Sequence, residues 1–273
     1  MSFTPQDLSE FAAFANRLAD AARLKTLPRF RNGIPIVNKL EETPGDDFDP
    51  VTDADREGER AIRDLIETTY PEHGILGEEF EERAGKSAWR WILDPVDGTR
   101  AFVCGCATWT TLIALEREGE PVLGLIDQPF INERWVGFSS SVTYSVGGKD
   151  VNARTSGVRE LAAARISTTD PLASAYYSEK EAQSFARVNA ASRVARFSMD
   201  AYAYGLLAIG ELDLVLETCL KRHDYAALIP IVEGAGGVVT NWRGHAVGTD
   251  DRGEVIAAAT PELHEAALKL LTT

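Results

Sequence analysis

Two aspartates lie three residues apart around a proline in the stretch WILDPVDGTRAF, residues 91–102. The apolar run 91–93 is typical of a buried strand, whereas Asp94, Asp97 and Gly98 are residues that end one. A turn whose aspartates bond backbone amides explains this stretch when it is taken alone. Acidic residues elsewhere in the chain must decide between that turn and a site that binds a cation.

Other acids stand where helices or strands begin or end. They are Asp53 and Asp55 in PVTDADREGE, Glu78 and Glu79 in ILGEEF, and Asp224 in RHDYAALIPIVEGAGG. An N-cap before an apolar helix is an alternative explanation for Asp224. If these groups converge, two carboxylates 4 Å apart repel by about 4 kcal/mol at an effective dielectric of 20. A converging cluster therefore predicts Mg²⁺, which takes a few carboxylates, waters and phosphate oxygens as ligands.

The spacing of DPVDGT separates it from two similar motifs. An EF-hand loop needs acids at alternating positions and a glycine at the sixth, which this stretch does not supply. Phosphatases with an aspartyl nucleophile carry one residue between the two acids, whereas two intervene here. The extra residue brings both side chains and the Val96 carbonyl around one point, which favours metal binding over nucleophilic attack.

Composition excludes several classes of protein. The 273 residues are 44% hydrophobic, enough for a core in one large or two smaller domains. The formal charge of −14 argues against binding to nucleic acid or anionic membranes. No apolar run has the length of a membrane span and the N-terminus does not resemble a signal peptide, so we expect a cytoplasmic protein. Three cysteines without a CxxC spacing favour neither disulfides nor a cysteine zinc site.

The elements that must position these acids differ between the two halves of the chain. In the first half, helical spacing predicts helices within residues 1–27 and 54–70, followed by short strands of a meandering sheet. The polar stretch 40–50 is predicted to be a mobile loop. After about residue 152, strands and helices alternate, ending in a helix that Thr260 caps and Pro261 begins. We therefore predict an α+β subdomain over 1–151, carrying most metal ligands, and an α/β subdomain over 152–273, carrying Asp224.

GEE, WILDPVDGT and HDYAALIPIVEGAGG, in that order, resemble the inositol monophosphatase family of Mg²⁺-dependent phosphatases. The resemblance covers residues 37–241. It implies an αβαβα layered sandwich of the α/β class, usually a homodimer, that acts on a small phosphorylated substrate with two or three Mg²⁺ ions.

The resemblance also assigns roles to individual residues. Glu78, Asp94 and the Val96 carbonyl would hold one Mg²⁺, and Asp94, Asp97 and Asp224 a second. Glu78 and Thr99 would place the attacking water, with Asp55 behind Thr99. The amides of Gly98 and Thr99 would contact the phosphate, and Glu217 matches the position that contacts the alcohol portion of the substrate.

The substrate is a narrower question. The segment from Asp200 to the GAGG motif, together with DGTRAF and TWTTLIALE, is similar to the histidinol-phosphate phosphatases of the family. Many relatives with broader sugar specificity have Asn at the position of Ala101 and Trp at that of His223. In a histidinol-phosphate enzyme, Glu217 or Asp200 could pair with the ammonium or imidazolium of the substrate. A helix N-cap at Asp200 and a solvated strand end at Glu217 are the alternatives for these two residues.

Inositol phosphate or another sugar phosphate, and a nucleotide 3′-phosphate, remain the alternative substrates. A rival from another class is a non-catalytic domain that binds Mg²⁺ and phosphate without hydrolysis. Glu78 and Thr99, which would place water, argue against that rival. The histidines His73, His223, His245 and His264 lack paired ligand spacing and are expected in loops or at the surface.

Overall fold

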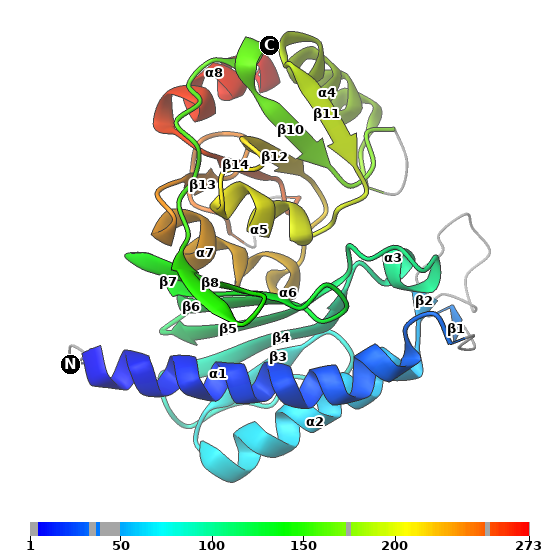
Figure 1. Cartoon of the computed structure of the whole chain (residues 1–273), viewed down its shortest axis with the longest axis vertical. Coiled ribbons are helices and arrows are strands. Elements are labelled where there is room, and N and C mark those ends of the chain that lie inside the picture. Colours follow the sequence, from blue (N-terminus) through cyan, green and yellow to red (C-terminus); the bar gives the residue numbers. More distant parts are fainter. Residues whose placement is uncertain (1–4, 33–36, 39–49, 173–175, 249–251, 273) are drawn as a thin grey trace.

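A computed structural model describes residues 5–32, 37–38, 50–172, 176–248 and 252–272, so the predicted loop over 40–50 lies almost entirely outside the described residues. Five layers follow one another from bottom to top in Figure 1: helices, sheet, helices, sheet, helices. This order confirms the predicted αβαβα sandwich of the α/β class.

The first layer consists of α1 (Pro5–Thr26) and α2 (Asp53–Thr69), the two helices predicted near the N-terminus. Buried apolar residues of both helices, such as Phe14 and Ile62, pack against Trp91 and Leu93 of the sheet above. A short helix (Leu27–Arg29) and a strand pair, β1 (Val37–Asn38) with β2 (Pro50–Val51), lie near the end of this layer.

A seven-stranded sheet forms the second layer, in the order β3-β4-β5-β6-β7-β8-β9. Its strands are β3 (Gly74–Gly77), β4 (Trp89–Asp97), β5 (Thr110–Arg117), β6 (Glu120–Gln128), β7 (Glu133–Phe138), β8 (Ser141–Val146) and β9 (Lys149–Asn152). From β4 onward each strand pairs antiparallel with the next, as a meander requires. The expected strands are present, and β8 and β9 extend the sheet beyond them.

The upper layers come from the second half of the chain. The middle helices are α5 (Tyr202–Ala208), α6 (Arg222–Tyr225) and α7 (Leu228–Gly234). The second sheet has the order β11-β10-β12-β14-β13, with β10 (Arg165–Thr168), β11 (Val194–Phe197), β12 (Leu214–Glu217), β13 (Val238–Thr240) and β14 (Val255–Ala258). A short helix (Leu161–Ala163), α4 (Glu179–Ala191) and α8 (Pro261–Leu271) complete this half, and Thr260 accepts from the Leu263 amide as the predicted cap.

Two elements differ from their predicted boundaries. The strand that was expected to end at Leu93 continues to Asp97, because the chain passes the proline through a register shift against β5 between Asp94 and Asp97. The apolar helix expected directly after Asp224 is divided into α6 and α7, and α6 begins at Arg222. Asp224 is therefore the third residue of a helix, rather than its N-cap.

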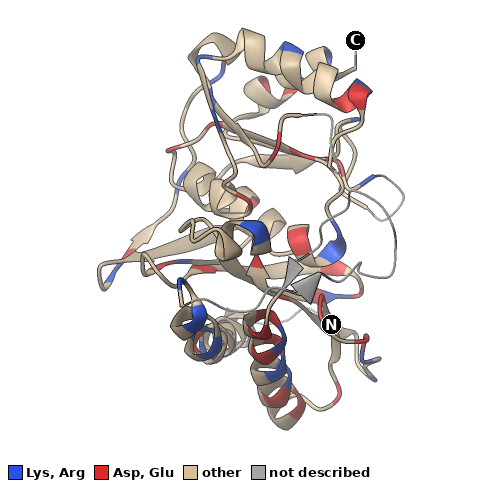
Figure 2. Cartoon of the chain, turned by 90° about the vertical axis from the view of Figure 1, so that its right-hand side faces the viewer, with Lys and Arg blue, Asp and Glu red and all other residues tan. Residues whose placement is uncertain are grey.

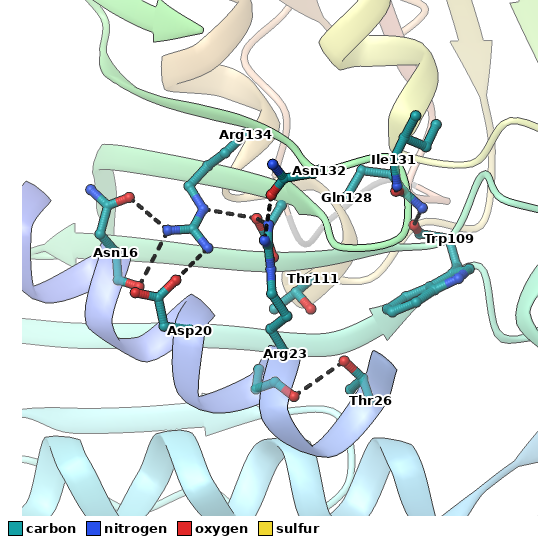
Figure 3. Close-up of polar contacts among 12 residues, drawn as sticks. Asn16, Asp20, Arg23, Thr26, Trp109, Thr111, Gln128, Ile131, Asn132 and Arg134 are labelled. Atoms are coloured by element: carbon teal, nitrogen blue, oxygen red, sulfur yellow. Dashed lines mark hydrogen bonds and ion pairs between the residues drawn. The ribbon is translucent and has the colours of Figure 1, made fainter. Parts of the chain in front are cut away.

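A buried carboxylate fastens α1 to the first sheet. Asp127 on β6 is completely buried and accepts hydrogen bonds from Arg23 of α1, at 2.6 and 3.2 Å, and from Arg134 of β7, at 2.8 Å. Arg134 also reaches Asn16 and Asp20 on α1, as Figure 3 shows. These contacts hold α1 in one orientation beneath the sheet whose strand β4 carries Asp94 and Asp97.

Charged residues are interspersed over the structure. Figure 2 shows Lys and Arg segments alternating with Asp and Glu segments, most densely along α2. With a formal charge of −14, this mixture of charges is unfavourable for binding a polyanion. Within the same residues, every helix is too short or too polar to cross a membrane.

Candidate active site

Three carboxylates from distant parts of the sequence meet between the two sheets. Asp94 and Asp97 come from the end of β4 and Asp224 comes from α6; one oxygen of each lies within 4.8 Å of the others. The structure thus brings Asp224 next to Asp94, although 130 positions separate the two residues in the sequence. Glu78, which follows the last residue of β3, lines the same pocket.

The conformation of this cluster follows from local hydrogen bonds. The Val96 amide donates to Asp94 (3.0 Å), and the Ala201 amide at the start of α5 donates to Asp97 (2.8 Å). The Lys221 amide donates to Asp224 (2.7 Å), and His223 Nε2 lies 3.3 Å from the other oxygen of Asp224. Backbone amides therefore aim each carboxylate toward the common centre.

The electrostatics of the cluster are unfavourable without a cation. Burial raises the pKa of Asp94 well above its usual range, and the charges of Glu78 and Asp97 raise it further. Burial also raises the pKa of Asp97 well above its usual range, followed by the charge of Asp200. The pKa of Asp224 is raised by burial as well, although His223 opposes the shift. Such a group of hard oxygen donors has the chemistry that Mg²⁺ requires of its ligands.

Thr99 and Asp55 lie beside the cluster. Asp55 is buried at the start of α2, where it accepts from the Thr52 amide (2.9 Å) and the Thr52 hydroxyl (2.6 Å) in a capping box. Its other oxygen lies 3.3 Å from the Thr99 hydroxyl, which is also 3.2 Å from the Val96 carbonyl. Burial raises the pKa of Asp55 to about 6.

Gly98 turns the chain from β4 into α3 (Thr99–Val103). Its φ of 78° is left-handed, a conformation that glycine adopts without strain. A side chain at this position would also approach the Asp200 carboxylate, since an ideal Cβ would lie 2.8 Å from it. The turn therefore leaves the backbone of residues 98 and 99 open to the pocket, which both residues line.

The opposite wall of the pocket is also acidic. Glu217, at the end of β12, is buried and accepts from the amide (2.8 Å) and the hydroxyl (2.9 Å) of Thr169. Burial raises the pKa of Glu217 to about 8, and burial raises that of Asp200 to about 6 against the opposing effects of Thr169 and Arg100. Asp200 has a left-handed φ of 47° and does not cap α5, which begins after Ala201. Both alternatives, an N-cap at Asp200 and a solvated strand end at Glu217, are wrong.

All ten residues predicted for the site lie in or beside one pocket of about 340 Å³, a volume suited to a small molecule. Thr169 and Tyr176, which line the wall near Glu217, were not predicted from the sequence. Arg100, whose guanidinium carbon lies 4.8 Å from the Tyr176 ring centre, was not predicted either. The position of Thr169 in the sequence was a usable signal. Thr169 directly follows β10, which pairs parallel with β11 and β12, and ligands often bind at the carboxyl ends of parallel strands.

The histidines differ in part from the expectation of loop or surface positions. His73 lies in the loop before β3, as expected, but it is buried and its Nδ1 accepts from the Trp91 indole N–H (3.2 Å). His264 lies on α8 and is buried beside Thr240 (2.7 Å). His223 lines the pocket next to Asp224. His73 packs in the first half of the chain and His264 in the second, and each buried ring has a hydrogen-bond partner.

Comparison with known proteins agrees with this geometry. The model of the inositol monophosphatase family matches residues 7–273. The chain is 39% identical to the chloroplastic bifunctional phosphatase IMPL2 of Arabidopsis thaliana, over 97% of this chain and 76% of that protein. It is 33% identical to the histidinol-phosphatase of Chlorobaculum parvum, over 89% of this chain and 90% of that protein. A solved inositol monophosphatase from Zymomonas mobilis superposes with a TM-score of 0.83 at 38% identity, covering 97% of this chain and 98% of that one. The chain belongs to the inositol monophosphatase family, and it is a phosphoric monoester hydrolase of that family.

Proposed function

We propose that this enzyme hydrolyses L-histidinol phosphate to L-histidinol and phosphate with the help of Mg²⁺. One observation carries the choice of substrate: the wall opposite the acid cluster holds two further carboxylates, Asp200 and Glu217. A substrate with a cationic alcohol portion gains charge-assisted hydrogen bonds there. Histidinol phosphate carries an ammonium group and an imidazole, whereas inositol phosphate is neutral beyond its phosphate.

The phosphate end of the substrate would lie against the acid cluster. Asp94, Asp97 and Asp224, with Glu78 and the Val96 carbonyl, would hold the Mg²⁺ ions. Bound Mg²⁺ supplies a Lewis acid that neutralises phosphate charge, lowers the pKa of water and stabilises the departing oxygen. The amides of Gly98 and Thr99 would orient the phosphate, because a glycine turn entering a helix presents N–H groups to an anion.

Glu78, Thr99 and Asp55 would place the attacking water. The Thr99 hydroxyl donates to Asp55, and a lone pair of its oxygen is then left to accept a hydrogen bond from water. Glu78 can accept the second hydrogen of that water, since its carboxylate borders the same pocket. This pair fixes the direction of attack toward the phosphorus, a contribution of positioning and proton acceptance.

A substrate panel tests the proposal. Phosphate release is measured with histidinol phosphate, inositol 1-phosphate, fructose 1,6-bisphosphate and a nucleotide 3′-phosphate, each with Mg²⁺ and with a chelator. We expect the highest kcat/KM for histidinol phosphate and no turnover without Mg²⁺. A higher kcat/KM for a neutral sugar phosphate would move the assignment to the sugar phosphatases of the family, and binding of Mg²⁺ without turnover of any substrate would favour the non-catalytic rival.

Three further features remain part of this proposal. The division into subdomains at residues 151 and 152 falls at the last residues of β9, after which the chain leaves the first sheet. A homodimer and a cytoplasmic location are what the resemblance and the composition predict. Two or three Mg²⁺ ions per site are expected from the number of acidic ligands.

A further inference from the structure

Arg222 connects the second half of the chain to the first sheet, two residues before Asp224. Its guanidinium donates to the Glu116 carboxylate on β5 and to the Gly119 carbonyl in the turn between β5 and β6. The guanidinium carbon also lies 5.5 Å from the ring centre of Tyr225, which is buried. Three contacts thus hold one side chain of a helix that is only four residues long.

Glu116 is suited to act as a fixed anchor. It is completely buried, and its second oxygen accepts from Arg90 on β4 at 2.8 and 3.1 Å. Arg90 and Glu116 are also register partners in the sheet, so this anchor lies on the strand that pairs with β4, which carries Asp94 and Asp97. A buried carboxylate between two guanidinium groups has little freedom to move, because each lost bond would leave a charge unpaired.

The acid cluster depends on how α6 is placed. Asp94 and Asp97 are covalently part of β4, whereas Asp224 reaches them from α6, which lies against the first sheet in Figure 1. The amide of Lys221, the residue before α6, orients the Asp224 carboxylate but does not fix the distance of the helix from β4. Arg222 ties α6 to Glu116 on β5, the strand that pairs with β4.

We propose that Arg222 and Glu116 are positioning residues that set the approach of Asp224 to Asp94 and Asp97, and thereby the affinity of the site for Mg²⁺. The inference rests on the proposed Mg²⁺ site, but it concerns residues outside the pocket. Loss of the ion pair between Arg222 and Glu116, here called the α6 tether, weakens Mg²⁺ binding because Asp224 is no longer held in place before the ion arrives.

Isothermal titration of the full chain with Mg²⁺ tests this inference, with thermal unfolding in EDTA measured alongside. We expect Arg222→Gln to weaken Mg²⁺ binding about tenfold or more, in the range typical of residues that orient metal ligands. Arg90→Gln is the matched control: it removes the other guanidinium from the same carboxylate, leaves the α6 tether intact, and should change the Mg²⁺ affinity less than about twofold. Both variants should lower the unfolding temperature in EDTA, since each leaves Glu116 with one partner.

A double-mutant cycle separates positioning from general loosening of the structure. In an Asp224→Asn background, Arg222→Gln should cause little further loss of Mg²⁺ affinity, because the ligand that it positions is already gone. Additive losses, or an equal loss in Arg90→Gln, would overturn the positioning role while leaving the phosphatase assignment in place. Failure of the unchanged chain to bind Mg²⁺ would overturn both. Arg222→Lys, which keeps the charge but not the two-point contact, should recover only part of the affinity.

Discussion

The Thr99 hydroxyl lies 3.3 Å from an oxygen of Asp55, whose other oxygen is occupied by the backbone and hydroxyl of Thr52. Thr99 therefore connects the start of α2 with the pocket, because its hydroxyl bonds Asp55 and the residue itself lines the pocket. The N-terminal cap of a helix therefore also orients a residue proposed to place water.

Replacement of Thr99 tests that role. We expect Thr99→Ala to lower kcat about 100-fold, because the water loses its hydrogen-bond acceptor, while KM changes little. Thr99→Ser retains the hydroxyl and should remain within about tenfold of the unchanged enzyme. Steady-state kinetics with histidinol phosphate distinguishes the two variants, and equal rates for both would remove Thr99 from the mechanism.

Charge repulsion in the acid cluster predicts opposite effects of one substitution with and without metal. Asp97→Asn should stabilise the protein in EDTA by about 1 kcal/mol, because it removes an acid whose pKa is raised by burial and by the charge of Asp200. The unchanged protein should gain about 2.7 kcal/mol from Mg²⁺ at 100 times its Kd. The variant should gain much less and lose turnover. Denaturant unfolding in EDTA and in Mg²⁺ measures both effects, and a loss of stability in EDTA would contradict the repulsion argument.

Glu217 should contribute to selectivity for a cationic substrate. Because burial raises its pKa to about 8, this carboxyl is protonated below that pH and ionised above it. We therefore expect KM for histidinol phosphate to fall as pH rises from 7 to 8.5, since the ionised form pairs with the cation.

Glu217→Gln should remove this trend and raise KM for histidinol phosphate more than KM for inositol 1-phosphate. The neutral substrate serves as the internal control, because both phosphates contact the same acid cluster. An equal rise for both substrates would assign Glu217 to the structure of the pocket wall.

His73 should make the stability of the first half depend on pH. Burial lowers the pKa of its ring from 6.5 to about 4 in the folded protein. The unfolded chain therefore takes up a proton that the folded chain excludes, and stability is lost as pH falls from 6.5 to 4. His73→Gln should reduce the free energy of unfolding that is lost in acid by about 2 kcal/mol. Unfolding free energies at pH 7 and pH 4.5 measure the difference between the two proteins.

The buried contacts of Asp127 with Arg23 and Arg134 should contribute strongly to the stability of the protein. Asp127→Asn should cost about 3 kcal/mol, because Arg23 and Arg134 then lose a buried anionic partner. Asp20→Asn is the matched control: Asp20 also bonds Arg134, but its side chain is 66% exposed, so we expect a loss below about 0.5 kcal/mol. Similar losses for the two variants would show that burial does not govern this network.

Much of the protein is determined by its sequence alone. The apolar periodicity of α1 and α2, the cap at Thr260, and the alternation of the second half are local patterns, and the structure contains the elements that they predict. The meeting of Asp94, Asp97 and Asp224 was also predictable, since these residues lie in short motifs whose order along the chain resembles one family.

Only the tertiary structure decided how these motifs meet. Asp224 is a plain helix-start acid in the sequence, and its approach to Asp94 depends on the docking of α6 on β5 through Arg222 and Glu116. Likewise, Glu217 resembles a solvated strand end until β10 and the Thr169 amide cover it. The physical reason is the same for both residues: burial, charge repulsion and a raised pKa arise from neighbours distant in the chain, and local sequence patterns do not contain those neighbours.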